Sequence, residues 1–254
     1  MTSILVTHSE KEITVKENIS DILRRDLKIV EPYPEMIAPT DSQVSGTAFF
    51  PGGSGVYCGS TAEKSILVLG QDFSTIADYN NMLAGIASDL SCPTWRNLII
   101  LFHEAGIDLK SCFFSNVFMG LRRTTTSIGK YPGYHDKEFV KRNRTFLQHQ
   151  IEVISPRGII TLGKYASEML AQTYPQELKT WLHYEALRNP YCGIIPNVHL
   201  MQEKCCCVAI EHPSMRWLNV QRRSFMGAKG NEAEVLMLQR LWEIVNLKGS
   251  TTNL

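Results

Sequence analysis

The sequence has no long apolar run, no cysteine pair at the spacing of a metal site and almost no excess of charge of either sign. No apolar stretch approaches the ~18 residues that a membrane-spanning helix needs, and no signal-peptide pattern follows the polar start. We therefore expect a cytoplasmic protein with no membrane partner. The seven cysteines are odd in number and none are spaced C-x2-C, so neither a disulfide framework nor a zinc or iron–sulfur site is predicted. We expect reduced, mostly buried thiols and no metal.

The charge balance excludes a strongly basic protein that coats DNA, because the net charge is +1. It leaves room for an enzyme that grips a few phosphates through a local patch. Ordinary solvated surface is the simplest interpretation of the basic clusters, among them the pair Arg122-Arg123, and it suits residues 141–144 in a predicted helix. The cluster of Arg216, Arg222 and Arg223 follows a predicted strand end, and we interpret these arginines as phosphate contacts.

The 254 residues are 44% hydrophobic and 20% charged, a composition typical of a compact domain with a sizeable core. Four short apolar runs each end on residues suited to chemistry. Buried parallel strands read as continuous hydrophobic runs, and open α/β sheets bind ligands at the carboxyl ends of their strands. The runs and the residues that follow them are 66–69 before Gly70, Gln71 and Asp72; 112–115 before Asn116; 159–162 before Gly163 and Lys164; and 208–210 before Glu211 and His212. We expect Asp72, Asn116 and His212 to face one crevice.

Helical patterns separate these runs, which predicts right-handed βαβ crossovers. The fold class expected is α/β, a three-layer α/β/α sandwich with a central, mainly parallel four-stranded sheet. The domain prediction is an N-terminal extension over 1–45 packed on the domain, a domain over 46–247 and a tail over 248–254. Helices are predicted over 18–28, through 78–90 with Ser74 or Thr75 as the cap, over 93–106 and 136–154, from Tyr165 onward and over 232–246. Loops are predicted over 32–59, which is rich in Pro, Gly and Ser, and from the Asn116 strand through Tyr134, which is polar.

The residues at these strand ends resemble the uracil-DNA glycosylase superfamily in order, spacing and flanking hydrophobics. The resemblance covers roughly residues 65–225. Its motifs are Gly70-Gln71-Asp72, Phe114-Ser115-Asn116-Val117, the segment 156–166 and His212-Pro213-Ser214. Each motif is weak alone, but four in the family's order are fairly specific. The family's three-layer fold agrees with the fold predicted above.

The resemblance implies a monomeric enzyme that acts without a cofactor on a nucleotide flipped out of single- or double-stranded DNA. It would hydrolyse the N-glycosidic bond and leave an abasic site. Asp72 matches the carboxylate that stabilises an oxocarbenium-like sugar and orients the attacking water. His212 matches the imidazole that donates a hydrogen bond to O2 of the departing pyrimidine. Asn116 matches the amide that reads the N3 and O4 edge, and Gln71 would help to line the pocket.

Taken singly, these residues have simpler interpretations. Asp72 after a strand is suited to a helix cap or an Asx turn, Asn116 to a turn, and a lone His before Pro to a structural role. Their coincidence with one family pattern favours the catalytic interpretation.

The chain also departs from the family. The most uracil-specific branch has a Tyr that blocks the C5 face of the base, and Ser74 stands at that position here. A small hydroxyl leaves room for a substituent, so strict selection of uracil is not expected. The aromatic residue that stacks on the flipped base is missing near Gly85, and Phe73 or Tyr79 is the predicted replacement. The cysteines of the family's iron–sulfur branch do not align.

Residues 212–218 would form the loop that enters DNA. Flipping a nucleotide costs a few kcal/mol of stacking, and an apolar wedge that fills the vacated space offsets this. The wedge candidates are Met215, Trp217 and Leu218, although at least one of them is expected to pack under the loop. Phosphate contacts are predicted from Gly163, Lys164, Ser214 and the 51–55 loop, because small residues allow close backbone approach.

The sequence thus favours a monofunctional DNA glycosylase for uracil or a 5-modified pyrimidine. Two alternatives remain open. One is a glycosylase selective for a bulky modified pyrimidine, as in modified phage DNA. The other is a catalytically weak nucleic-acid-binding protein on the same fold.

Overall fold

A computed structural model describes residues 19–37, 65–84, 92–183, 189, 191–200 and 203–247. The loop predicted over 51–55 and the tail over 248–254 lie outside these residues. Their predicted roles, and the domain boundaries drawn through them, stay predictions.

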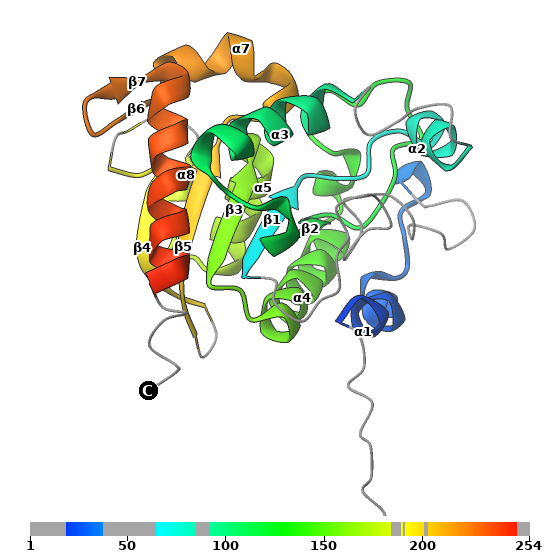
Figure 1. The fold of residues 1–254 in the computed structure, drawn as a ribbon. Helices are drawn as coiled ribbons and strands as arrows, with labels where there is room; N and C mark the ends of the chain where they lie inside the picture. The colour runs from blue at the N-terminus through cyan, green and yellow to red at the C-terminus, as the bar shows by residue number, and fades with distance from the viewer. Residues whose placement is uncertain are drawn as a thin grey trace, which may run out of the picture.

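A five-stranded sheet forms the centre of the fold, with the strand order β2-β1-β3-β5-β4 (Figure 1). The strands are β1 (Ile66–Gly70), β2 (Cys112–Asn116), β3 (Gly158–Leu162), β4 (Ile194–Leu200) and β5 (Glu203–Ile210). β1, β2, β3 and β5 are the four predicted strands and pair in parallel. The mainly parallel α/β prediction is confirmed.

The predicted number of strands was wrong, because β4 adds a fifth strand antiparallel to β5 at the edge of the sheet. Its register shifts between Ile195 and Val198, and Asn197 has a positive φ of 59°. Pro196 lies within this irregularity. Because proline is rare in strands, Pro196 argued against a strand at this position in the sequence. Proline is tolerated in edge strands and bulges, and β4 is a bulged edge strand.

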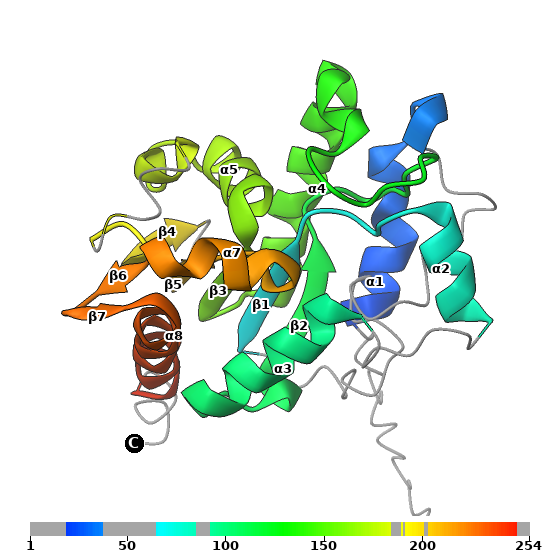
Figure 2. The same cartoon turned by 90° about the horizontal axis from the view of Figure 1, so that it is seen from above.

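Successive residues of each central strand point to opposite faces, and both faces are covered by helices. On one face, Leu67 and Leu69 belong to a cluster with residues of α1 (Ile19–Asp26), α4 (Lys137–Ile154) and α5 (Gly163–Thr173). On the other face, Ile66 and Val68 belong to a cluster with residues of α3 (Pro93–Ala105) and α8 (Gly230–Leu247). Figures 1 and 2 show the resulting three layers. This is why the strands read as continuous apolar runs rather than alternating ones.

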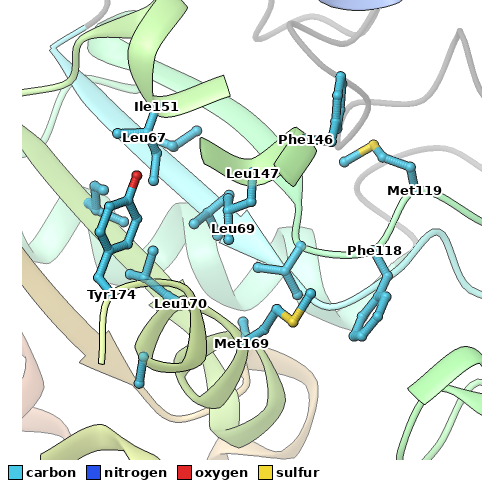
Figure 3. Packing of buried hydrophobic residues seen from close by; sticks show 14 of the residues in the cluster. Leu67, Leu69, Phe118, Met119, Phe146, Leu147, Ile151, Met169, Leu170 and Tyr174 are labelled. Atoms are coloured by element: carbon cyan, nitrogen blue, oxygen red, sulfur yellow. The ribbon is translucent and has the colours of Figure 1, made fainter. Parts of the chain in front are cut away.

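Figure 3 shows the first cluster from close by. Leu67 and Leu69 of β1 lie among Leu147 and Ile151 of α4 and Leu170 of α5. All are buried, so this packing fixes the strand whose end carries Asp72.

The observed α-helices correspond to predicted ones except the short α7, which lies in a segment predicted as a loop. They are α1 (Ile19–Asp26), α2 (Ile76–Leu83), α3 (Pro93–Ala105), α4 (Lys137–Ile154), α5 (Gly163–Thr173), α7 (Arg216–Asn219) and α8 (Gly230–Leu247). The 3-10 turns are Leu27–Val30, Glu35–Ile37, Leu109–Ser111, Pro132–His135, Lys179–Leu182, Pro213–Met215 and Val220–Arg222, and a hairpin is formed by β6 (Ser224–Phe225) and β7 (Ala228–Lys229). Across the described parts of the chain, no helix has both the length and the apolar character to cross a bilayer.

α2 begins directly after Thr75, one of the two predicted caps, whose Oγ1 accepts the Asp78 N–H at 3.0 Å. The end predicted for this helix at residue 90 lies outside the described residues.

The N-terminal segment 19–37 packs closely against the domain. Leu23, Val30 and Ile37 are fully buried in the cluster that includes α4. Arg142 of α4 donates from Nε to the carbonyl of Val30 at 3.0 Å and from Nη2 to that of Pro32 at 2.7 Å. This part of the predicted extension therefore contributes to the core.

We predict that Leu23→Ala lowers the free energy of unfolding by about 2–5 kcal/mol, since a fully buried leucine is truncated. Met36→Ala is the control, because Met36 is largely exposed in the same segment. Urea unfolding followed by circular dichroism measures both. Equal, small losses would mean that the segment is a detachable extension.

Candidate active site

The sheet brings the three predicted catalytic and base-reading positions to one edge. Asn116 ends β2 and pairs with Gly70 at the end of β1, two residues before Asp72. β3 separates β1 from β5, whose last residue Ile210 lies two residues before His212. Burial lowers the pKa of His212 and the charge of Asp72 acts against that shift, so the two side chains are within electrostatic reach.

Asp72 has four hydrogen-bond donors around its carboxylate. Oδ1 accepts from the Ser74 N–H at 2.9 Å and from Arg122 Nε at 3.0 Å. Oδ2 accepts from Arg122 Nη2 and from Gln71 Nε2, both at 2.7 Å. A carboxylate offers about four lone-pair sites, so this one is saturated by the chain itself. The Asp72 and Arg122 side chains are only 5% and 3% exposed.

Sequence reasoning missed Arg122, which belonged to a basic pair that read as ordinary surface. The same guanidinium also donates to the carbonyls of Ile128 at 3.2 Å and Gly129 at 2.9 Å. The ring of Tyr131 lies 5.7 Å from it, and burial followed by the Asp72 charge raises the Tyr131 pKa well above its usual value. The segment after β2 is therefore part of the site, although in sequence it reads as a polar loop.

His212 lies in a tightly packed position. Burial lowers its pKa below 6.5, and Asp72 partly opposes that shift, so the ring is neutral at pH 7. Its Nδ1 is 2.8 Å from Ser214 Oγ. A Cβ added to Gly163, which has a φ of +80°, would come within 2.9 Å of the His212 Cβ. Gly163 thus has a packing role beside the predicted phosphate contact, which stays a prediction.

The predicted base-binding residues differ in their burial and in the groups that they contact. Asn116 is 1% exposed at the end of β2. Phe73 and Tyr79 are buried in the core cluster, where burial raises the Tyr79 pKa. Ser74 has a positive φ of 69°, and its hydroxyl donates to Asp78 in the first turn of α2 at 2.5 Å. Their contacts with a base stay predictions.

Arg216 and Arg223, which were predicted to contact phosphates, are both buried against Glu234 of α8. Their burial argues against those contacts, which stay predictions. Glu234 Oε2 pairs with Arg216 Nη1, Oε1 lies 3.2 Å from Arg223 Nε, and Oε1 also accepts the Glu211 N–H at 2.7 Å. Burial raises the Glu234 pKa, and Arg223 and Arg216 oppose that shift. These arginines fix the loop after β5. Arg222 between them is exposed.

The wedge candidates lie on the surface of that loop. Trp217 is 72% exposed, Leu218 is 49% exposed, and Met215 is also exposed. Met215 is the least exposed of the three, at 36%, and the expectation that at least one of them packs underneath the loop stays a prediction. Asn97 of α3 stabilises the loop, because its Nδ2 donates to the Pro213 carbonyl at 2.8 Å. Lys164, at the start of α5, is exposed as well.

Within the described ranges, no three His, Cys, Asp or Glu side chains are grouped so that they could hold a metal ion.

A family model described as the uracil DNA glycosylase superfamily matches residues 38–242. The chain belongs to this superfamily. A search of curated proteins found no match. Membership supports a uracil-DNA glycosylase-like function in general.

We predict that Arg223→Met lowers the free energy of unfolding by about 3–5 kcal/mol, because it removes one partner from a buried ion pair. Arg222→Met, at the exposed neighbouring position, should change it by less than about 0.5 kcal/mol. Urea unfolding of the two variants makes the comparison. Equal stability of the two variants would contradict a structural role for the pair of Arg223 with Glu234.

Proposed function

We propose that this protein is a monofunctional DNA glycosylase that hydrolyses the N-glycosidic bond of a flipped uracil or 5-modified pyrimidine. The observation that carries this proposal is the convergence of Asp72, Asn116 and His212 at the carboxyl ends of parallel strands in a chain of this superfamily. Water would add to C1′ of the sugar, and the base would leave with the electrons of the C1′–N bond. The products are an abasic site and a free base.

His212 would stabilise the departing base as a neutral hydrogen-bond donor. Its lowered pKa favours the uncharged ring. We infer that the Ser214 hydroxyl donates to Nδ1, which places the single ring proton on Nε2. Nε2–H would then donate to O2 of the pyrimidine as negative charge gathers there. Ser214 is thus a positioning residue for His212, in addition to any phosphate contact.

Asp72 would supply negative charge near the oxocarbenium-like sugar. To orient a water as well, it must exchange one of its four donors. Gln71 is the donor most easily displaced, since its side chain is partly exposed and gives one N–H to Asp72, whereas Arg122 is buried and gives two. We infer that a water takes the place of the Gln71 amide when the substrate is bound.

The pairing of Asp72 with Arg122 also favours the second candidate, a catalytically weak nucleic-acid-binding protein. A carboxylate that is already ion-paired and saturated with hydrogen bonds stabilises a cationic sugar less than a free carboxylate does. Measuring cleavage directly decides between the two.

The first test is single-turnover cleavage of duplexes that each carry one uracil or one modified pyrimidine. Asp72→Asn and His212→Ala should each lower the rate by roughly 10²-fold or more while DNA affinity stays similar. Glu243→Gln, at an exposed carboxylate on α8, is the control. Protonation of His212 should reduce the parent rate only at a lower pH than an ordinary imidazole would require, because burial lowers the His212 pKa. A parent protein that binds all duplexes and cleaves none would identify the weak binder.

Selectivity is proposed to depend on Ser74, whose short side chain is bonded to Asp78 and would leave the C5 side of the base open. Replacing it with Tyr would add strain, because Ser74 has a φ of 69°. Asn and Gly both tolerate this conformation.

We therefore predict that Ser74→Asn slows excision of 5-substituted pyrimidines more than excision of uracil, by about 1–3 kcal/mol in transition-state free energy. Ser74→Gly should keep both activities. Competition assays with paired duplexes give the ratio. If the parent excises only uracil, or if Asn slows both substrates equally, another side chain closes that face. A parent that prefers a bulky modified base would support the alternative glycosylase.

Phosphate and base-stack contacts are proposed for the exposed residues around the loop after β5. Met215, Trp217 and Leu218 would form the wedge, and Arg222 and Lys164 would face phosphates.

A further inference from the structure

The loop from Arg123 to Lys130 is tied to the candidate active site at its far end. The carbonyl of Gly129 accepts from Arg122 Nη2 and, at 3.1 Å, from Gln71 Nε2. Both donors also bind Asp72. The residues just before Lys130 therefore lie one side chain away from the Asp72 carboxylate.

The loop also has a defined shape of its own. Thr124 Oγ1 donates to the Thr126 carbonyl at 3.0 Å, and the Ile128 N–H donates to Thr126 Oγ1 at 3.2 Å. These bonds hold the backbone that presents Ile128. The Ile128 side chain is nevertheless 72% exposed, so the loop does not use it for packing.

The chemistry of the loop surface suits a nucleic acid. Its sequence, RTTTSIGK, carries two cations, four hydroxyl groups and no carboxylate. Residues 125–130 are all exposed. Cations and hydroxyls are common phosphate ligands, and an exposed aliphatic side chain can contact the faces of unstacked bases.

The position of the loop complements that of the wedge candidates. It follows β2, whereas the loop with Trp217 and Leu218 follows β5, and β1 and β3 lie between these strands. Seen from above in Figure 2, α7 lies on one side of the end of β1, and the chain that follows β2 lies on the other. The two exposed apolar tips thus flank the residues proposed to hold the flipped nucleotide.

We propose that residues 123–130 form a second DNA-contacting element, in which Ile128 packs against bases beside the flipped nucleotide while Arg123 and Lys130 neutralise phosphates. This proposal rests on the proposed function for the place of the flipped nucleotide. It adds a contact on the β2 side, opposite the wedge proposed after β5.

Binding is measured by fluorescence anisotropy with a duplex that holds a stable abasic-site analogue. Ile128→Ala should weaken binding by about tenfold or more. The matched control is Met226→Ala, since Met226 is 78% exposed at the tip of the β6–β7 hairpin, and it should stay within about twofold of the parent. Because Ile128 is exposed, the unfolding transition of the variant should match that of the parent.

A photo-crosslinking residue at position 128 gives a second readout. It should crosslink to nucleotides next to the abasic analogue, and the same residue at position 226 should not. Unchanged affinity of Ile128→Ala together with no crosslink at 128 would overturn the proposal while leaving cleavage intact. A parent that crosslinks through 128 but cleaves no base would uphold this contact and reject the glycosylase function. A parent that binds no DNA would overturn both.

Discussion

The ion pair between Asp72 and Arg122 is the interaction on which the candidate site depends. It joins the end of β1 to the segment after β2, and both side chains are almost fully buried. A buried charge without a partner is strongly unfavourable, so neither residue can leave this position alone. Arg122 also binds the carbonyls of Ile128 and Gly129, which means that one guanidinium sets both the carboxylate and the neighbouring loop.

A second buried cluster of charged residues fixes the loop that follows β5. Glu234 of α8 binds Arg216 and Arg223 and accepts the N–H of Glu211, the residue before His212. The loops after β2 and after β5 are therefore both fixed by buried arginine–carboxylate pairs. Arginines close to a strand end can serve to shape the loop rather than to meet phosphates, and their burial distinguishes the two roles.

The sequence predicted the parts of the fold that rest on local pattern. Apolar runs located the four parallel strands, and helical spacing located the helices, since both reflect burial along consecutive residues. It failed where a contact joins distant residues: Arg122 lies 50 residues from Asp72, and Glu234 lies 18 residues beyond Arg216 on another element. No periodicity marks such pairs. Pro196 hid the edge strand for a local reason, because its residue type is rare in strands but allowed at bulges.

The electrostatics of the site bear on how catalysis could work there. Asp72 is neutralised by Arg122, and burial keeps His212 uncharged, so little net charge faces a substrate. In the proposed reaction, stabilisation of a charge-separated transition state would then come from the paired Asp72 carboxylate and from fixed donors and dipoles that need no reorganisation. A neutral pyrimidine would meet a neutral pocket in the ground state. The preference for the transition state would arise only as the glycosidic bond breaks and charge develops on both fragments.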